Sequence, residues 1–181
     1  MGGDDKGLMR LAGRPLVAHV IDALAPQVGR ILINTNRHEA QYAALGYPVI
    51  GDTIPGHPGP LAGLLSAMEH VGQGLVLAVP CDTPLLPPDL VPRLRAALEP
   101  PARLSTVHDG ERLQPAILLA PAALAPTLRA ALERNENKVE GWVRSQPFAS
   151  VDFSDCPQAF ANINTPEQLT ALERRLETHH E

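Results

Sequence analysis

Apolar residues recur every three or four positions in residues 16–24 and again in residues 61–71. This is the spacing of one face of an α-helix. Between such segments lie short, almost wholly apolar runs, such as residues 30–34 and 75–79, which predict buried strands. Alternation of this kind is typical of helices that cover a largely parallel sheet, so the sequence predicts an α/β fold.

The remaining segments continue the alternation. Further helices are predicted at residues 38–45, 87–98, 122–134, 139–145 and 165–176, and further strands at residues 48–50, 103–108, 114–119 and 148–153. Asp109-Gly110 lies between two of these strands and is a typical hairpin turn. Those two strands are therefore expected to pair antiparallel, which would make the sheet mixed.

The last predicted helix has a recognisable start. Thr165-Pro166-Glu167-Gln168 has the pattern of a capping box, with proline at the first helical position. Leu169, Leu172 and Leu176 recur at helical spacing and are expected to face the core.

Length and composition point to one ordinary globular domain over residues 1–181, with residues 177–181 as a frayed tail. No apolar run approaches the ~20 residues of a membrane helix. The first residues lack the basic-then-apolar order of a secretory signal, so we expect a cytoplasmic protein.

Cys81 and Cys156 lack the number and spacing of a zinc site or disulfide framework, which favours reduced, buried thiols.

The charge balance excludes one class of partner. The formal net charge is −5, and nucleic-acid binding needs clustered lysine and arginine. A polyphosphate ligand would therefore have to be held by local groups and a cation. Lys6 and Lys138 are the only lysines of the sequence, which makes each a candidate for such a local role.

Polar residues follow several of the predicted strands. Ligands of open α/β sheets bind beyond the carboxyl ends of the strands, so these positions are the candidate site. They are Asn34, Asn36, Asp52, Asp82, Asn162 and Asn164. For the asparagines, helix capping or an Asx turn is the commoner role of the residue type, and near Asn164 the better cap is Thr165.

Asp82 follows an apolar strand and precedes Thr83-Pro84, which places a carboxylate at the edge of the predicted sheet. Mg²⁺ is typically held by one or two carboxylates together with substrate phosphates, so Asp82 is a candidate metal ligand; the alternative is a turn-initiating aspartate.

Lys6 lies in a glycine-bearing polar segment that could bind phosphate. Its alternative is a disordered chain end.

Two further segments could border ligands. Residues 58–63 lead into a helix with little side-chain bulk, so the backbone at Pro60, Leu61 and Gly63 could approach a flat ligand; a rigid loop is the alternative. Gln114-Pro115 and Lys138 could border a second-substrate pocket, although for Lys138 in isolation we favour a solvated side chain.

His108-Asp109-Gly110 could supply a general base, but a hairpin turn explains all three residues, and we favour the turn.

Together, several short motifs resemble the molybdenum cofactor guanylyltransferases over nearly the whole chain. The segments are Met1-Gly2-Gly3 with Asp5-Lys6-Gly7-Leu8, Asn34-Thr35-Asn36-Arg37-His38, residues 58–63, Pro80-Cys81-Asp82-Thr83-Pro84, His108-Asp109-Gly110-Glu111, Asp152-Phe153 and Asn162-Ile163-Asn164-Thr165-Pro166. Their order and spacing are specific, although several are weak individually.

The resemblance implies a three-layer α/β/α nucleotidyltransferase-like Rossmann-type fold with a mostly parallel, mixed sheet. It implies that GMP passes from GTP to the phosphate of Mo-molybdopterin, with Mg²⁺ as cofactor and pyrophosphate as by-product. Molybdenum-insertion proteins and apo-molybdoenzymes would be transient partners. By position, the resemblance implies GTP binding for Lys6, Asn34, Asp52, Pro60, Leu61 and Gly63. It implies Mg²⁺ and nucleotide binding for Asp82, and catalysis for Lys6 and Asp82. Molybdopterin binding is implied for Asn162, Asn164 and Lys138.

One departure from the family pattern concerns the start. Family members have a strand and a Leu-Ala-Gly-Gly-x-Gly-x-Arg loop just before the Met-Gly-Gly found here at residues 1–3. We therefore expect residues 1–7 to be the remnant of a glycine-rich phosphate loop, and this form to bind GTP weakly.

The resemblance leaves rival functions open. Molybdopterin cytidylyltransferases and nucleotidyltransferases that act on sugar or alcohol phosphates share the fold and the metal chemistry. A noncatalytic nucleotide- or cofactor-binding module is the alternative from a different class.

Overall fold

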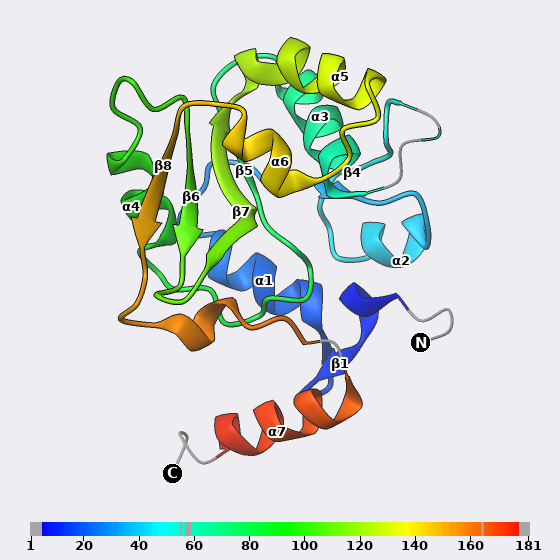
Figure 1. The fold of residues 1–181 in the computed structure, drawn as a ribbon. Coiled ribbons are helices and arrows are strands. Elements are labelled where there is room, and N and C mark those ends of the chain that lie inside the picture. Colours follow the sequence, from blue (N-terminus) through cyan, green and yellow to red (C-terminus); the bar gives the residue numbers. More distant parts are fainter. Residues whose placement is uncertain (1–4, 55, 57–58, 164, 178–181) are drawn as a thin grey trace.

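The structure is a computed structural model that describes residues 5–54, 56, 59–163 and 165–177. Helices and strands alternate through most of it (Figure 1). The helices are α1 (Leu16–Leu24), α2 (Glu39–Ala43), α3 (Pro60–Val71), α4 (Leu90–Ala96), α5 (Ala125–Glu133), α6 (Val139–Arg144) and α7 (Pro166–Glu177), with 3-10 turns η1 (Lys6–Leu8), η2 (Ala122–Leu124) and η3 (Pro157–Phe160). The strands are β1 (Arg10–Leu11), β2 (Arg14–Pro15), β3 (Ile33–Asn34), β4 (Val49–Ile50), β5 (Leu75–Ala78), β6 (Leu104–His108), β7 (Leu113–Pro121) and β8 (Phe148–Asp152).

The strands form a mixed sheet, as expected. The main sheet has the order β5-β7-β6-β8, in which β7 is antiparallel to both neighbours and β6 is parallel to β8. Two smaller pairs accompany it: β3 and β4 are parallel, and β1 and β2 form a hairpin. Parallel pairing in the main sheet is less extensive than expected, because the hairpin turn returns β7 between β5 and β6.

Helices cover both faces of the main sheet, which confirms the three-layer α/β/α fold. Residues 117–120 of the long strand β7 alternate: Leu118 and Ala120 pack with α3, α5 and α6, whereas Ile117 and Leu119 pack with α1 and α4. Successive side chains of a strand point to opposite faces, so a fully apolar stretch buries both. Figure 1 shows the sheet between these two helical layers.

The predicted elements are found, with shifted ends. The segment predicted as a strand at residues 30–34 pairs only at Ile33 and Asn34, because β4 offers just two partners. The helix predicted at 87–98 begins later, at Leu90, after a turn in which the Leu90 N–H donates to the Pro87 carbonyl. The remaining differences are of one to a few residues.

The capping box of α7 is confirmed. The Gln168 N–H donates to Thr165 Oγ1 at 3.2 Å, and the Thr165 N–H donates to Gln168 Oε1 at 3.1 Å. Leu172 is buried and Leu169 partly buried against Leu11 and Ile163. The side chain of Leu176 and residues 178–181 lie outside the described residues. Figure 1 shows α7 and the β1–β2 hairpin together below the sheet.

Among the described helices, none combines the length and the apolar character needed to cross a membrane.

Candidate active site

One apolar cluster lies beneath the candidate residues. Its buried members are Val17, Ile21, Ile33 and Tyr42, and Leu8, Val49 and Cys81 pack against it. Several candidate residues lie next to, or near, a member in the chain: Asn34 follows Ile33, Asp82 follows Cys81, and Lys6 precedes Leu8. Burial of the apolar neighbour therefore brings polar residues from distant segments to one region.

Lys6 and Asp82 lie together. The Lys6 Nζ atom is 3.6 Å from Asp82 Oδ2, and the side chains are 48% and 10% exposed respectively. The carboxylate is thus largely shielded, whereas the lysine reaches solvent. Lys6 and Asp82, predicted separately from sequence as phosphate and metal ligands, form one charged pair.

Residues 5–8, at the start of the described chain, make specific contacts with the rest of the molecule. Asp5 Oδ1 accepts hydrogen bonds from the Gly7 N–H at 3.1 Å and the Tyr42 hydroxyl at 2.6 Å. A Cβ atom added at Gly7 would overlap the Tyr42 hydroxyl and lie 3.1 Å from Cys81 Sγ. This close approach fixes the backbone on both sides of Lys6; Gly2 and Gly3 lie outside the described residues.

The Tyr42 hydroxyl and the Cys81 thiol lie near the Lys6–Asp82 pair, and both are neutral. Burial, the hydrogen bond to Asp5 and the nearby Cys81 and Asp5 raise the pKa of Tyr42 well above its usual value. Burial, together with the Asp82 and Asp5 carboxylates, raises the pKa of Cys81 to about 11. Both therefore stay protonated near pH 7, and Cys81 is a free, partly buried thiol rather than a nucleophile.

Asn34 and Asn36 hold Asp52 between them. Asn34 Nδ2 donates to Asp52 Oδ1 at 3.1 Å, Asn36 Nδ2 donates to Asp52 Oδ2 at 2.6 Å, and the Asp52 N–H donates back to Asn36 Oδ1 at 2.8 Å. The alternative role of these asparagines as caps of the next helix is excluded, since His38 is the N-cap of α2. A carboxylate is the stronger acceptor, so the amides pair with it.

The first turn of α3 packs against the Asn34 side chain and does not expose its backbone to a ligand as expected. Leu61 is 2% exposed and belongs to the core, and Pro60 is exposed at the first helical position. The idea of open backbone at Gly63 is wrong: the Asn34 side chain fills that space, and a Cβ added at Gly63 would lie 2.9 Å from Asn34 Cγ. Gly63 therefore makes room for Asn34. Pro58 lies outside the described residues.

We predict that Gly63→Ala raises the KM for the nucleotide about tenfold while the protein still folds. Alanine is a better helix former than glycine, but its methyl group would displace the Asn34 amide from Asp52. A loss of this hydrogen-bonded arrangement corresponds to roughly tenfold in affinity. Steady-state kinetics and thermal unfolding of the variant measure the two effects.

The matched control is Gly141→Ala in α6. A Cβ there would lie 3.8 Å from Lys138 Cβ, which is ordinary contact. This variant should keep the wild-type nucleotide KM. An unchanged KM in Gly63→Ala would contradict the assignment of Gly63 as the support for Asn34.

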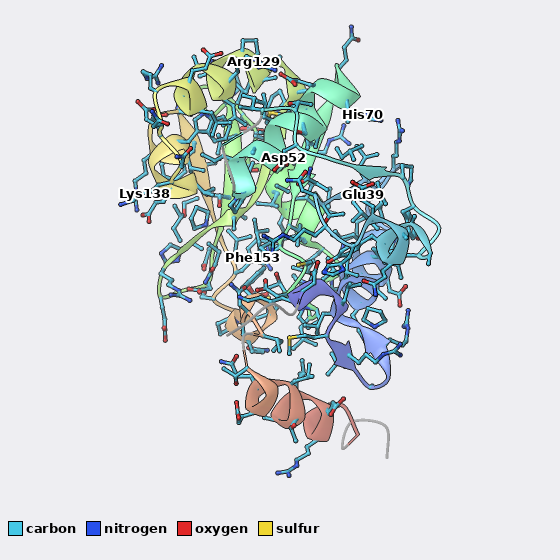
Figure 2. The ribbon with its side chains drawn as sticks, turned by 90° about the vertical axis from the view of Figure 1, so that its right-hand side faces the viewer. Glu39, Asp52, His70, Arg129, Lys138 and Phe153 are labelled. Atoms are coloured by element: carbon cyan, nitrogen blue, oxygen red, sulfur yellow. The ribbon has the colours of Figure 1, made fainter. Side chains whose placement is uncertain are left out.

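A cavity of about 770 Å³ lies beside the β6–β7 hairpin. Its lining residues are His108, Glu111, Arg112, Leu113, Gln114, Pro115, Glu140, Arg144, Phe148, Ser150 and Asn162. Gln114, Pro115 and Asn162 thus border a cavity as expected. Lys138 is absent from this lining; it is the N-cap of α6, and Figure 2 places it at the edge of the molecule. Asn164 lies outside the described residues.

Sequence reasoning overlooked the basic groups of this cavity, Arg112 and Arg144. In the sequence, Arg112 follows a predicted turn and Arg144 belongs to a predicted helix. Neither has a local pattern that indicates a cavity residue. Arg144 Nε donates to Glu140 Oε1 at 2.8 Å, and Glu140 and Glu111 line the same cavity, so the lining carries both signs of charge. A guanidinium group suits a phosphate or carboxylate ligand.

The hairpin-turn interpretation of His108-Asp109-Gly110 is confirmed. Asp109 Oδ1 accepts from the N–H groups of Glu111 at 2.9 Å and Arg112 at 2.8 Å, and Gly110 has φ 98°. Burial opposes ionisation of Asp109, but hydrogen bonds from Arg112, Gln114 and Glu111 outweigh it and hold its pKa below the usual value. Asp109 is therefore occupied in organising the turn.

The cavity and the charged pair are connected through main chain. The Ile163 N–H donates to the Asp82 carbonyl at 2.9 Å, and the preceding residue, Asn162, lines the cavity. Asp82 thus contacts Lys6 through its carboxylate and the cavity wall through its backbone. Such an arrangement can bring a phosphate-bearing ligand at Lys6 and a second ligand in the cavity to one point.

The donor chemistry near Asp82 fits a hard divalent cation. No group of three or more potential ligands from His, Cys, Asp and Glu occurs among the described residues. A largely shielded carboxylate beside a lysine ammonium nevertheless matches Mg²⁺, which takes few protein ligands and completes its shell with water and substrate phosphate.

Comparisons with known proteins agree with this picture. Residues 1–150 match the MobA-like NTP transferase domain family. The molybdenum cofactor guanylyltransferase of Shewanella sp. (strain ANA-3) is 48% identical over 173 residues, which cover 95% of this chain and 88% of that relative. The enzyme of the same name from Shewanella sediminis (strain HAW-EB3) is 47% identical with the same coverage.

Solved structures show the same fold. Molybdopterin-guanine dinucleotide biosynthesis protein A from Archaeoglobus fulgidus superposes with a TM-score of 0.79 at 19% identity, covering 97% of this chain and 92% of that chain. The 2-C-methyl-D-erythritol 4-phosphate cytidylyltransferase from Thermus thermophilus has a TM-score of 0.70 at 17% identity, covering 95% and 94%. Since the family match spans most of the sequence and relatives are almost half identical, the chain belongs to the MobA-like NTP transferase family.

Proposed function

We propose that this nucleotidyltransferase transfers GMP from GTP to the phosphate of Mo-molybdopterin. A phosphate oxygen of molybdopterin would bond to the α-phosphorus of GTP, and the bond from that phosphorus to the β-phosphate oxygen would break. The products are molybdopterin guanine dinucleotide and pyrophosphate. The observation that carries the proposal is the Lys6–Asp82 pair, at 3.6 Å. The Asp82 backbone is bonded to Ile163, which follows the cavity residue Asn162.

Each part of the site has a role in this proposal. Lys6 would bind the triphosphate and, with Asp82, stabilise charge as pyrophosphate leaves. Asn34 and Asp52 would hold the guanosine, beside the start of α3. On the other side Asn162, with Asn164, would contact molybdopterin; we add Arg112 and Arg144 there as the groups that neutralise its phosphate. Lys138 does not line the cavity, so it would contact molybdopterin only where the ligand extends beyond the cavity.

Mg²⁺ is the proposed cofactor, held by Asp82. When bound, it would supply positive charge to the phosphates without any proton transfer. We also propose that the whole chain acts as one domain, and that molybdenum-insertion proteins and apo-molybdoenzymes contact it transiently.

The test is a pyrophosphate-release assay with Mo-molybdopterin and GTP, CTP, UTP or ATP. We expect GTP to be preferred by at least about tenfold, since loss of one base-specific hydrogen-bonded contact has that size. Chelation of divalent cations should abolish release, and added Mg²⁺ should restore it. Preference for CTP would point instead to a cytidylyltransferase, and absence of transfer with every nucleotide would leave a noncatalytic binding module.

A further inference from the structure

A buried hydroxyl group links the helix α3 to the loop that carries Asp52. Ser66 is 1% exposed. Its Oγ atom donates to the Ala62 carbonyl within α3 at 2.9 Å, lies 3.3 Å from Thr53 Oγ1, and accepts a hydrogen bond from the Thr53 N–H at 2.8 Å. The main chain directly after Asp52 is therefore fixed to a helix that belongs to the core.

The same loop has a second, more exposed attachment. Thr53 Oγ1 donates to Glu69 Oε2 at 2.9 Å, and Arg129 Nε of α5 donates to Glu69 Oε1 at 3.1 Å. Figure 2 shows Arg129 at the top of the molecule and Asp52 below it. Exposed ion pairs contribute little, so the buried Ser66 bond is the stronger restraint on the loop.

Serine is not required at this position by the helix itself. Alanine would be the better helix former in the interior of α3, and a hydroxyl that bonds back to the preceding turn slightly weakens a helix. What the hydroxyl adds is a partner for the Thr53 N–H, which an alanine side chain could not provide. The benefit of Ser66 therefore lies in the loop and not in α3.

We propose that Ser66 is a positioning residue for the nucleotide. By holding the Thr53 main chain, it keeps the Asp52 carboxylate aligned between the Asn34 and Asn36 amides, at 3.1 and 2.6 Å. The inference rests on the proposed function, in which Asp52 and Asn34 bind the nucleoside. It adds a residue that acts on nucleotide affinity and base choice through Asp52 and not by contact with the ligand.

The test compares Ser66→Ala with wild type, using calorimetry with GTP and Mg²⁺ and steady-state kinetics. We expect the Kd and KM for GTP to rise about tenfold, as when a buried N–H loses its partner. The kcat should change by less than about twofold, because the phosphate-binding pair is untouched. Thr53→Val keeps the main-chain bond to Ser66 and should raise KM by less than about threefold.

Ser105→Ala is the matched control for loss of a buried serine hydroxyl. Ser105 is 0% exposed, and its Oγ atom donates to the Leu94 carbonyl at 2.7 Å, on the opposite face of the sheet. Its loss should lower stability comparably and leave the GTP Kd unchanged. If Ser66→Ala behaves like Ser105→Ala, or if Thr53→Val has the full effect, the positioning role is refuted.

A double-mutant cycle tests the route through Asp52. In an Asp52→Ala background, Ser66→Ala should change the GTP Kd by less than about twofold, because residues that act through one another are not additive. Full additivity would overturn the proposal. Absence of GTP binding in the wild type would instead refute the proposed function, so the two failures are distinguishable.

Discussion

Replacement of Asp82 by asparagine will lower kcat for nucleotidyl transfer by at least about 10²-fold, which is the size of effect expected when a preorganised electrostatic group is lost. Asparagine keeps the shape of the side chain but removes the charge that would hold a divalent cation. The fold should persist, because the substitution changes only the side chain. The Asp82 carbonyl, which accepts a hydrogen bond from the Ile163 N–H, is unaffected. Kinetics over a range of Mg²⁺ concentrations and circular dichroism measure both outcomes.

Asp22→Asn is the control for loss of an acidic side chain. Asp22 is 58% exposed and pairs with Arg14 at 2.8 Å, in an ion pair of α1 and β2. We expect its activity and magnesium dependence to match the wild type. Retained transfer in Asp82→Asn would remove Asp82 from the mechanism.

Lys6→Met will lower kcat/KM for the nucleotide by about 10²-fold, since a lysine ammonium against a triphosphate stabilises both the bound substrate and the charge that develops on departing pyrophosphate. Methionine retains much of the apolar stem. The η1 turn should keep its place, because it is held by the Asp5 hydrogen bonds and the tight packing of Gly7, neither of which uses the ammonium. Kinetics with GTP and thermal unfolding provide the measurement.

Arg30→Met removes a positive charge elsewhere and serves as the comparison. Arg30 is exposed, and its side chain contacts His70 Nε2 at 3.2 Å. Its kcat/KM should stay within about twofold of wild type, as is usual for surface substitutions. A Lys6→Met enzyme of similar activity would show that the triphosphate is held without Lys6.

Local patterns predicted most of the helices and strands of the described chain. The capping box at Thr165 is an example, because both of its hydrogen bonds join residues three apart. The hairpin at Asp109 is another, since one carboxylate satisfies two N–H groups of the same turn. Such features depend on neighbours in the chain and can be read from it.

Residue types alone misjudged the surroundings of Asp52. For Asn34 and Asn36 the commoner role of the residue type was helix capping, and Gly63 was expected to leave its backbone open. Instead a carboxylate from the end of another strand, Asp52, draws both amides, and the Asn34 side chain fills the space over Gly63. The support from Ser66 was not foreseen, because a serine within an amphipathic helix gives no signal of its partner in a distant loop.

The sequence by itself determined the α/β class, the positions of most elements and the residue types available for phosphate and metal binding, because these follow from hydrophobic periodicity, local turn chemistry and the charge of individual side chains. Only the tertiary structure decided which of those residues meet. Lys6 and Asp82 are paired because Leu8 and Cys81 are packed against one apolar cluster, and Asn34 lies in the same region because Ile33 belongs to that cluster. Burial of apolar surface acts on the fold as a whole, so the contacts that it imposes between distant polar residues are absent from any local pattern.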